Sequence, residues 1–230
     1  MQLPFFYEAS LPVDDRFILS EESSRHIVQV LRMKENETLV LTNGKGETQT
    51  AEILDANKKK VTVKILKRDF SPERAPRISL GIGLIKNKTR FEWFVEKAAE
   101  IGIDKIFPLI TARTEKQSFN KDRAQSIAVS AMLQSQQSWL TEVQELISFE
   151  ELVTRTGVTG RFIAHCADGE KKVLGSSPDD SIILIGPEGD FTPTEIALAA
   201  QHHFIPVSLG NTRLRTETAA IVAAVICKFA

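Results

Sequence analysis

The sequence predicts a small β-barrel followed by an α/β domain with a mostly parallel sheet. Before about residue 70, short alternating strands are separated by tight turns, whereas strands and helices alternate from residue 78 onward. Between these regions, residues 71–77 place two prolines among charged residues, which disfavours continuation of a strand or a helix. We therefore expect a barrel over residues 1–70, a linker over 71–77 and an α/β domain over 78–230.

The first region contains one helix and three clear strands. Ser20 is a good N-cap, and the acidic Glu21 and Glu22 suit the first turn of a helix because of its dipole. Strands are expected at about 37–42, from 47 to about 54, and at 61–66, joined by turns at 43–46 and 55–57. This is the pattern of a small barrel.

The second region predicts strands at 78–85, 103–110, 161–166, 181–185 and 205–209. Helices are expected from about 91 to Gly102, over 120–137, from Thr192 to about 202, and over 216–229. The last of these helices is apolar nearly all round from Ala219 to Cys227. Such a helix must be buried, either in the core or against a second copy of the chain.

Composition excludes several classes of protein. The chain has 230 residues, of which 42% are hydrophobic, and its longest apolar run is far shorter than the roughly 20 residues that span a bilayer. Cys166 and Cys227 have no metal-ligand spacing, and neither do the four histidines. We expect a cytoplasmic protein with no membrane segment and no metal, and both cysteines as small core residues.

Charge is unevenly distributed, although the net charge is only −1. Residues 78–124 hold nine Lys/Arg against six Asp/Glu, whereas residues 125–230 hold seven against twelve. In the first region, six basic residues follow one another with no acid between them: Lys58, Lys59, Lys60, Lys64, Lys67 and Arg68. This run is either a solvated hairpin or an edge that contacts phosphates.

Two segments have the character of ligand-binding loops. The buried strand at 182–185 leads into Gly186-Pro187-Glu188-Gly189, and a helix capped by Thr192 follows. The strand ending near Leu209 leads into Gly210, two arginines and a Thr-Glu-Thr helix start. Ligands bind beyond the carboxyl ends of parallel strands, where glycines let the backbone approach them. The alternative is that both are ordinary turns, with Arg213 and Arg215 as surface charges.

The motifs themselves carry a resemblance. Ile185-Gly-Pro-Glu-Gly189, followed by Leu209-Gly-x-x-x-Leu214-Arg-Thr-Glu-Thr-Ala219, resembles the C-terminal motifs of the SPOUT superfamily of RNA methyltransferases. The particular residues of both motifs resemble those of the RsmE family, the 16S ribosomal RNA (uracil-N3)-methyltransferases. The likeness extends over nearly the whole chain, including His26 to Lys34 and Phe91 to Ile103.

The resemblance implies a trefoil-knotted α/β domain and a PUA-like, RNA-binding barrel. It also implies S-adenosyl-L-methionine (SAM) as cofactor, a homodimer with SAM near its interface, and 16S rRNA, in assembled small ribosomal subunits, as partner. The family's SAM-binding loops match these residues here: Ile185, Gly186, Pro187, Glu188, Gly189, Leu209, Gly210, Leu214, Arg215, Glu217, Thr218 and Ala219.

Catalytic and RNA-binding roles are hypotheses at this stage. Arg215 would stabilise the anion that develops on the uracil, and Glu217 would act as a base or only favour the start of its helix. The candidate RNA contacts are His26, Arg32, Lys58, Lys59, Lys60, Lys86 and Lys88.

Some positions depart from the family pattern. The family has a second glycine where Asp190 stands, and its arginine before the Leu-Arg pair is displaced by one position, to Arg213. The alternatives to N3 methylation of uridine are another knotted RNA methyltransferase, acting on a ribose 2′-hydroxyl or a tRNA base, and a non-catalytic RNA-binding protein of this fold.

Overall fold

The structure is a computed structural model that describes residues 3–115, 118–177 and 179–229. By internal contacts the chain divides into two compact units. The first unit comprises Met1–Glu73 with Met132–Leu140, and the second comprises Arg74–Ala131 with Thr141–Ala230. The predicted fold class is confirmed, because a half-barrel sheet precedes an α/β domain with a parallel sheet. The described helices include none that is long and apolar enough to cross a membrane.

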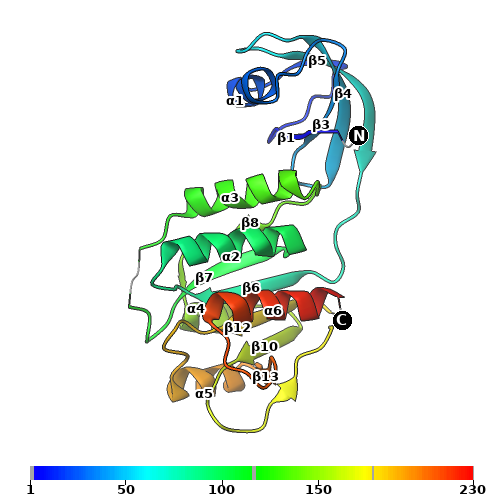
Figure 1. Cartoon of the computed structure of the whole chain (residues 1–230). Helices are drawn as coiled ribbons and strands as arrows, with labels where there is room; N and C mark the ends of the chain where they lie inside the picture. The colour runs from blue at the N-terminus through cyan, green and yellow to red at the C-terminus, as the bar shows by residue number, and fades with distance from the viewer. Residues whose placement is uncertain (1–2, 116–117, 178, 230) are drawn as a thin grey trace. The chain divides into compact units, whose positions relative to one another are not determined.

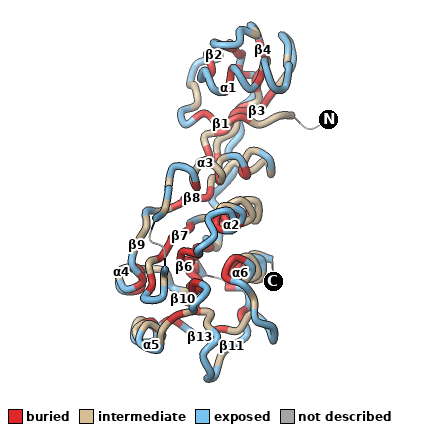
Figure 2. The backbone as a smooth tube through the Cα atoms, turned by 60° about the vertical axis from the view of Figure 1, so that its left-hand side comes forward, coloured by how far each residue is buried: buried red, intermediate tan, exposed pale blue. Residues whose placement is uncertain are grey.

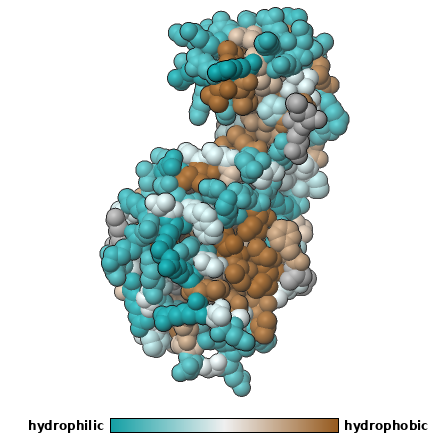
Figure 3. All heavy atoms as spheres, in the orientation of Figure 1, coloured by the Kyte–Doolittle hydropathy of each residue, from teal (hydrophilic) through white to brown (hydrophobic). Residues whose placement is uncertain are grey.

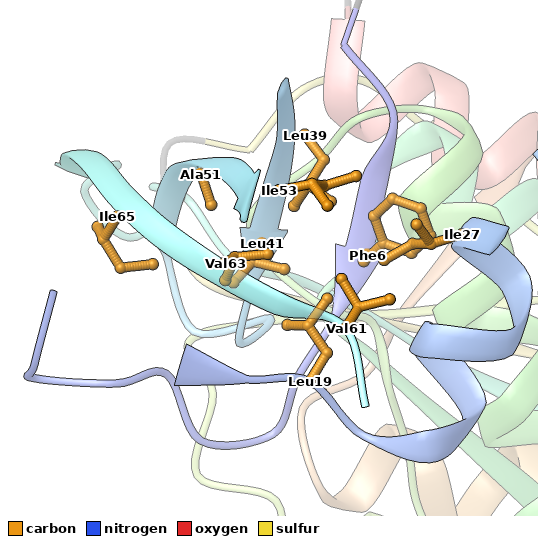
Figure 4. Packing of buried hydrophobic residues seen from close by; sticks show 10 residues of the cluster. All are labelled: Phe6, Leu19, Ile27, Leu39, Leu41, Ala51, Ile53, Val61, Val63 and Ile65. Atoms are coloured by element: carbon orange, nitrogen blue, oxygen red, sulfur yellow. The ribbon is translucent and has the colours of Figure 1, made fainter. Parts of the chain in front are cut away.

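The first unit is a five-stranded sheet in the order β1-β3-β4-β5-β2. Its elements in chain order are β1 (Phe5–Tyr7), β2 (Arg16–Ile18), α1 (Glu21–Arg25), η1 (His26–Val30), β3 (Thr38–Thr42), β4 (Glu47–Asp55) and β5 (Thr62–Phe70). Pairing is antiparallel except between β1 and β3. Figure 4 shows Ile27 of η1 packed with Phe6 and the inward side chains of β3, β4 and β5. The Ser20 hydroxyl accepts a hydrogen bond from the Ser23 N–H, so this residue is the N-cap that the sequence predicts.

The segment Met132–Leu140 completes the first unit, although it is distant in sequence. The N–H of Gly46 donates to the carbonyl of Ser138 at 2.8 Å, and the N–H of Leu140 donates to that of Gly44 at 2.9 Å. The indole Nε1 of Trp139 donates to the carbonyls of Ser71 and Pro72. The unit is therefore built from two separate stretches of chain.

The second unit is built on the strands β6 (Ile78–Gly83), β7 (Lys105–Ile110), β8 (Glu142–Val143), β9 (Ile147–Ser148), β10 (Gly160–Ala164), β11 (Lys172–Val173), β12 (Ser181–Ile185) and β13 (Ile205–Ser208). Their order is β11-β13-β10-β12-β6-β7-β8, with β9 also on β7. Every pairing in this sheet is parallel.

Helices cover both faces of this sheet. The helices of the chain after β6 are α2 (Lys88–Ile101), α3 (Lys121–Gln134), α4 (Phe149–Arg155), α5 (Pro193–Gln201) and α6 (Thr216–Phe229). Figure 2 shows α2 and α6 on one side of β6 and β10, and α4 and α5 on the other. Strands β6 and β12 are buried along their whole length, which explains why their sequences are mostly apolar and do not alternate with charged residues.

Helix α6 is only partly covered within the described chain. Its buried face consists of Ala220, Ala223, Ala224 and Cys227, which meets the expectation of core burial on one side. Val225 and Phe229 remain 42% and 69% exposed, and Trp93 of the neighbouring α2 is 43% exposed. Figure 3 shows hydrophobic residues gathered over α2 and α6. An apolar surface is therefore available there for a further partner.

Candidate functional site

The parallel sheet brings three loops to one edge. Strand β10 pairs in parallel with both β12 and β13, so the carboxyl ends of all three strands point the same way. The loops that follow them, near residues 165–171, 186–191 and 209–215, surround a cavity of about 720 Å³. This volume is within the range of sites for small organic ligands, and the position is the usual one in open α/β sheets.

The loop after β12 is held in shape from several sides. The N–H of Asp190 donates to the carbonyl of Pro187 at 2.9 Å and closes a tight turn. Glu188 accepts a hydrogen bond from the backbone N–H of Lys86 at 2.9 Å. The guanidinium of Arg113 donates to the carbonyl of Gly189 at 2.7 Å. The loops after β6 and β7 thus fix the turn, which presents its backbone to the cavity.

Two glycines near this turn pack closely against neighbouring groups. A Cβ at Gly83 would lie 2.5 Å from the backbone N of Pro187, so only glycine lets β6 pack this closely. A Cβ at Gly189 would lie 3.1 Å from the side chain of Arg113. These glycines serve loop packing.

The loop after β13 leads into helix α6. Gly210 has a φ of +122°, a left-handed conformation that favours glycine, and its N–H donates to the Ser208 hydroxyl at 3.3 Å. Thr216 and Glu217 begin α6 and are both buried. Both residues also line the cavity, so the start of this helix, with its free N–H groups, lies beside it.

Ten of the twelve residues predicted to bind the cofactor line the cavity. They are Ile185, Gly186, Pro187, Glu188, Leu209, Gly210, Leu214, Arg215, Glu217 and Ala219. Gly189 and Thr218 lie outside the lining, because Gly189 packs on Arg113 and Thr218 is exposed on α6.

The third loop was not predicted from the sequence. Ala164, His165, Cys166 and Lys171 line the cavity, as does Arg90 of α2. The expectation that Cys166 is a core residue is wrong: it is exposed at this edge, whereas Cys227 is buried as expected. The strand at 161–166 was recognisable, but its place between β12 and β13 was not.

The two candidate catalytic side chains lie in different surroundings. Glu217 is only 8% exposed and pairs with Arg90, with 3.7 Å between Oε1 and Nε. Arg215 is exposed, and in the described part of the chain no carboxylate lies within ion-pair distance of it. Arg215 is therefore free to meet an anionic ligand, whereas Glu217 is already neutralised.

His165 is the most unusual polar side chain of the cavity. Both of its ring nitrogens are shielded from solvent, and neither has a hydrogen-bond partner of good geometry among the described residues. Burial lowers the pKa of His165, and Lys171 lowers it further, against the opposing effects of Asp190 and the backbone of Ala167. The imidazole is therefore neutral near pH 7.

The candidate RNA contacts are distributed over both units. His26, Arg32, Lys58, Lys59 and Lys60 are exposed on the first unit, and the three lysines lie in the turn between β4 and β5. Lys86 and Lys88 are exposed on the second unit, where the ammonium of Lys86 lies 2.6 Å from Glu115.

Family models match both parts of the chain. Residues 72–228 match an RNA methyltransferase domain, and residues 19–66 match an RNA methyltransferase PUA domain. The chain belongs to the RNA methyltransferase family. Among the described residues, no group of three or more His, Cys, Asp or Glu side chains is placed to hold a metal ion.

Relatives match this RNA methyltransferase over nearly its whole length. The ribosomal RNA small subunit methyltransferase E of Rickettsia conorii is 28% identical over 90% of this chain and 86% of its own. The protein of that name from Neisseria gonorrhoeae, whose structure has S-adenosyl methionine bound, is 28% identical with a TM-score of 0.88. The match covers 97% of this chain and 96% of that chain. A putative methyltransferase from Legionella pneumophila, in complex with SAM, is 31% identical with a TM-score of 0.87. The match covers 98% of this chain and 97% of that chain.

Gly83→Ala tests the packing beneath the cavity. The added methyl group would displace Pro187, so we expect a loss of about 1–3 kcal/mol in the free energy of unfolding, measured by urea denaturation. Gly157→Ala is the matched control, because nothing lies within 4 Å of its added Cβ. Equal stability of the two variants would contradict this account of the loop.

Proposed function

We propose that this protein methylates N3 of a specific uridine in 16S ribosomal RNA, with SAM as methyl donor. The proposal rests on one observation above all: three loops at the carboxyl edge of the parallel sheet enclose a single cavity. It is supported by the family assignment and by the relatives named for small-subunit RNA methylation.

The cavity suits SAM by its lining as well as its size. It combines apolar side chains such as Ile185 and Leu209 with the glycines Gly186 and Gly210, and it holds the unpaired ring nitrogens of His165. We assign cofactor binding to the predicted loops, with Gly189 and Thr218 acting through loop packing and helix α6. We also assign cofactor binding to the loop at 165–171 and to Arg90.

SAM supplies an electrophilic methyl group on a sulfonium sulfur. The residues of this chain hold the base in line with it, and positioning of this kind contributes roughly 7–11 kcal/mol. The guanidinium of Arg215 stabilises the negative charge on the uracil oxygens as the N3 proton passes to solvent. The bond from N3 to the methyl group would form as the bond from the methyl group to sulfur breaks, with the neutral thioether as leaving group. Glu217, buried and paired with Arg90, orients the start of α6 and is a poor candidate for the base.

The first unit, which contains the matched PUA domain, docks on the RNA. Its contacts are proposed at His26, Arg32 and the lysines of the β4–β5 turn, with Lys86 and Lys88 nearer the methyltransferase loops. Assembled small subunits in the cytoplasm are the proposed substrate. The apolar surface of α2 and α6, with Trp93, Val225 and Phe229, is the proposed homodimer interface.

Incubation with radiolabelled SAM and unmodified small subunits tests the function directly. We expect one methyl group per subunit, recovered as N3-methyluridine after nucleoside analysis. A methylated ribose, a methylated tRNA base or no transfer would each favour an alternative and contradict the proposal.

Arg215→Ala separates catalysis from cofactor binding. Loss of a group that stabilises the transition state should slow single-turnover methylation by about 10²–10³-fold. Arg155→Ala, at a surface ion pair on α4, is the control and should keep the wild-type rate. Full single-turnover activity of Arg215→Ala would remove the catalytic role.

Simultaneous replacement of Lys58, Lys59 and Lys60 by Ala tests docking. If these lysines meet phosphates, RNA affinity should fall, and the slope of log affinity against log salt should decrease by about 0.7–0.9 for each lost contact. Lys105→Ala and Lys121→Ala are controls, because these side chains pair with Glu142 and Glu145. An unchanged slope would show that the turn is merely solvated.

A further inference from the structure

Asp190 connects two of the loops that enclose the cavity. Its Oδ2 accepts a hydrogen bond from the backbone N–H of Cys166 at 2.7 Å, and its Oδ1 accepts one from the N–H of Phe191 at 2.8 Å. Cys166 follows β10, whereas Asp190 follows β12. One carboxylate therefore fixes the position of the chain directly after His165.

The backbone of Asp190 is adapted to this arrangement. Its φ of +62° is left-handed, a conformation that glycine adopts freely and that Asp and Asn tolerate best among other residues. Glycine at this position would supply the backbone conformation but no side chain. Here the side chain adds a link between loops that glycine lacks.

His165 is the residue that this link positions. Its side chain lines the cavity, and both ring nitrogens are shielded and unpaired among the described residues. A buried polar group without a partner is costly, so the geometry calls for a ligand that supplies one. A neutral imidazole offers one N–H donor and one acceptor.

We propose that His165 is a cofactor-binding residue that hydrogen-bonds the adenosyl part of SAM, and that Asp190 is the positioning residue that holds it in place through the Cys166 N–H. This inference rests on the proposed function. The adenosyl hydroxyls and the adenine edge both carry donors and acceptors that match a neutral imidazole.

The charge state of His165 agrees with this role. Its lowered pKa keeps the ring uncharged at neutral pH, so the imidazole adds no positive charge to the arginines and the lysine that already line the cavity. The ionisable groups around it are the loop residues Lys171 and Asp190 and the other lining groups: Arg90, Cys166, Glu188, Arg213, Arg215 and Glu217. Protonation below the lowered pKa removes the acceptor and adds repulsion, so SAM affinity should fall as the pH decreases from 7 to 5.

Calorimetric titration with SAM tests the contact. Loss of one shielded hydrogen bond in His165→Leu should weaken Kd about tenfold at pH 7.5. His165→Asn keeps a donor and an acceptor, so its Kd should stay within about threefold of the wild type, while the dependence of Kd on pH between 7 and 5 is lost. Binding by His165→Leu within about twofold of the wild type would overturn the contact.

A double-mutant cycle tests the positioning. Asp190→Gly should weaken Kd about five- to tenfold, but by less than about twofold when His165 is already Leu, because both changes then remove one interaction. Asn also tolerates the left-handed backbone and keeps one acceptor. We therefore expect Asp190→Asn to weaken the Kd for SAM by an intermediate factor at an unchanged melting temperature, which keeps the test valid even if the glycine variant is unstable. Fully additive effects would overturn the positioning role. Failure of the wild-type protein to bind SAM would instead reject the proposed function.

Discussion

Parallel pairing of β10 with both β12 and β13 is the constraint on which the site depends. Because all three strands run in the same direction, the loops that follow them meet at one edge, although the ends of successive strands are more than twenty residues apart along the chain. The buried, apolar β12 lies beside β10 and β6 and anchors the most tightly held of these loops. The chemistry of the cavity then depends on the side chains and backbone groups that each loop contributes to its lining.

The loops differ in how they are held. The loop after β12 is hydrogen-bonded to the backbone of Lys86 and to the side chain of Arg113. Its glycine and proline turn is therefore held in place by residues of neighbouring loops. The loop after β10 is tied to it through Asp190. The loop after β13 depends on Gly210 and on the start of α6. Positively charged Arg215 remains available at this edge, while Arg90 neutralises Glu217.

Local signals in the sequence predicted much of the fold. Ser20 and Thr192 cap helices as expected, and Gly102 ends α2 in a left-handed conformation. The five strands predicted for the second unit lie close to their expected ranges, whereas the two-residue strands β8, β9 and β11 were not predicted. These features depend on neighbours within a few residues, which periodicity and capping rules describe well. The candidate loops near Gly186 and Gly210 were also visible, because strand ends followed by glycine form a local pattern.

Other features depend on contacts between distant residues, and the sequence did not reveal them. The order of the parallel strands brings the loop of His165 and Cys166 to the cavity, and no local pattern encodes that order. Arg90 faces Glu217 across more than a hundred residues. The unpaired ring nitrogens of His165 likewise become apparent only when its neighbours are known.

The participation of residues 132–140 in the first unit has a consequence for biosynthesis. The backbone hydrogen bonds that Gly44 accepts from Leu140 and that Gly46 donates to Ser138 cannot form until the ribosome has added those residues. Translation adds about 5–20 residues per second, so several seconds pass between synthesis of the half-barrel strands and synthesis of the segment that completes the unit. During this interval the carbonyls of Gly44 and Ser71 and the N–H of Gly46 lack these native partners, so this end of the sheet is left open until the later segment arrives.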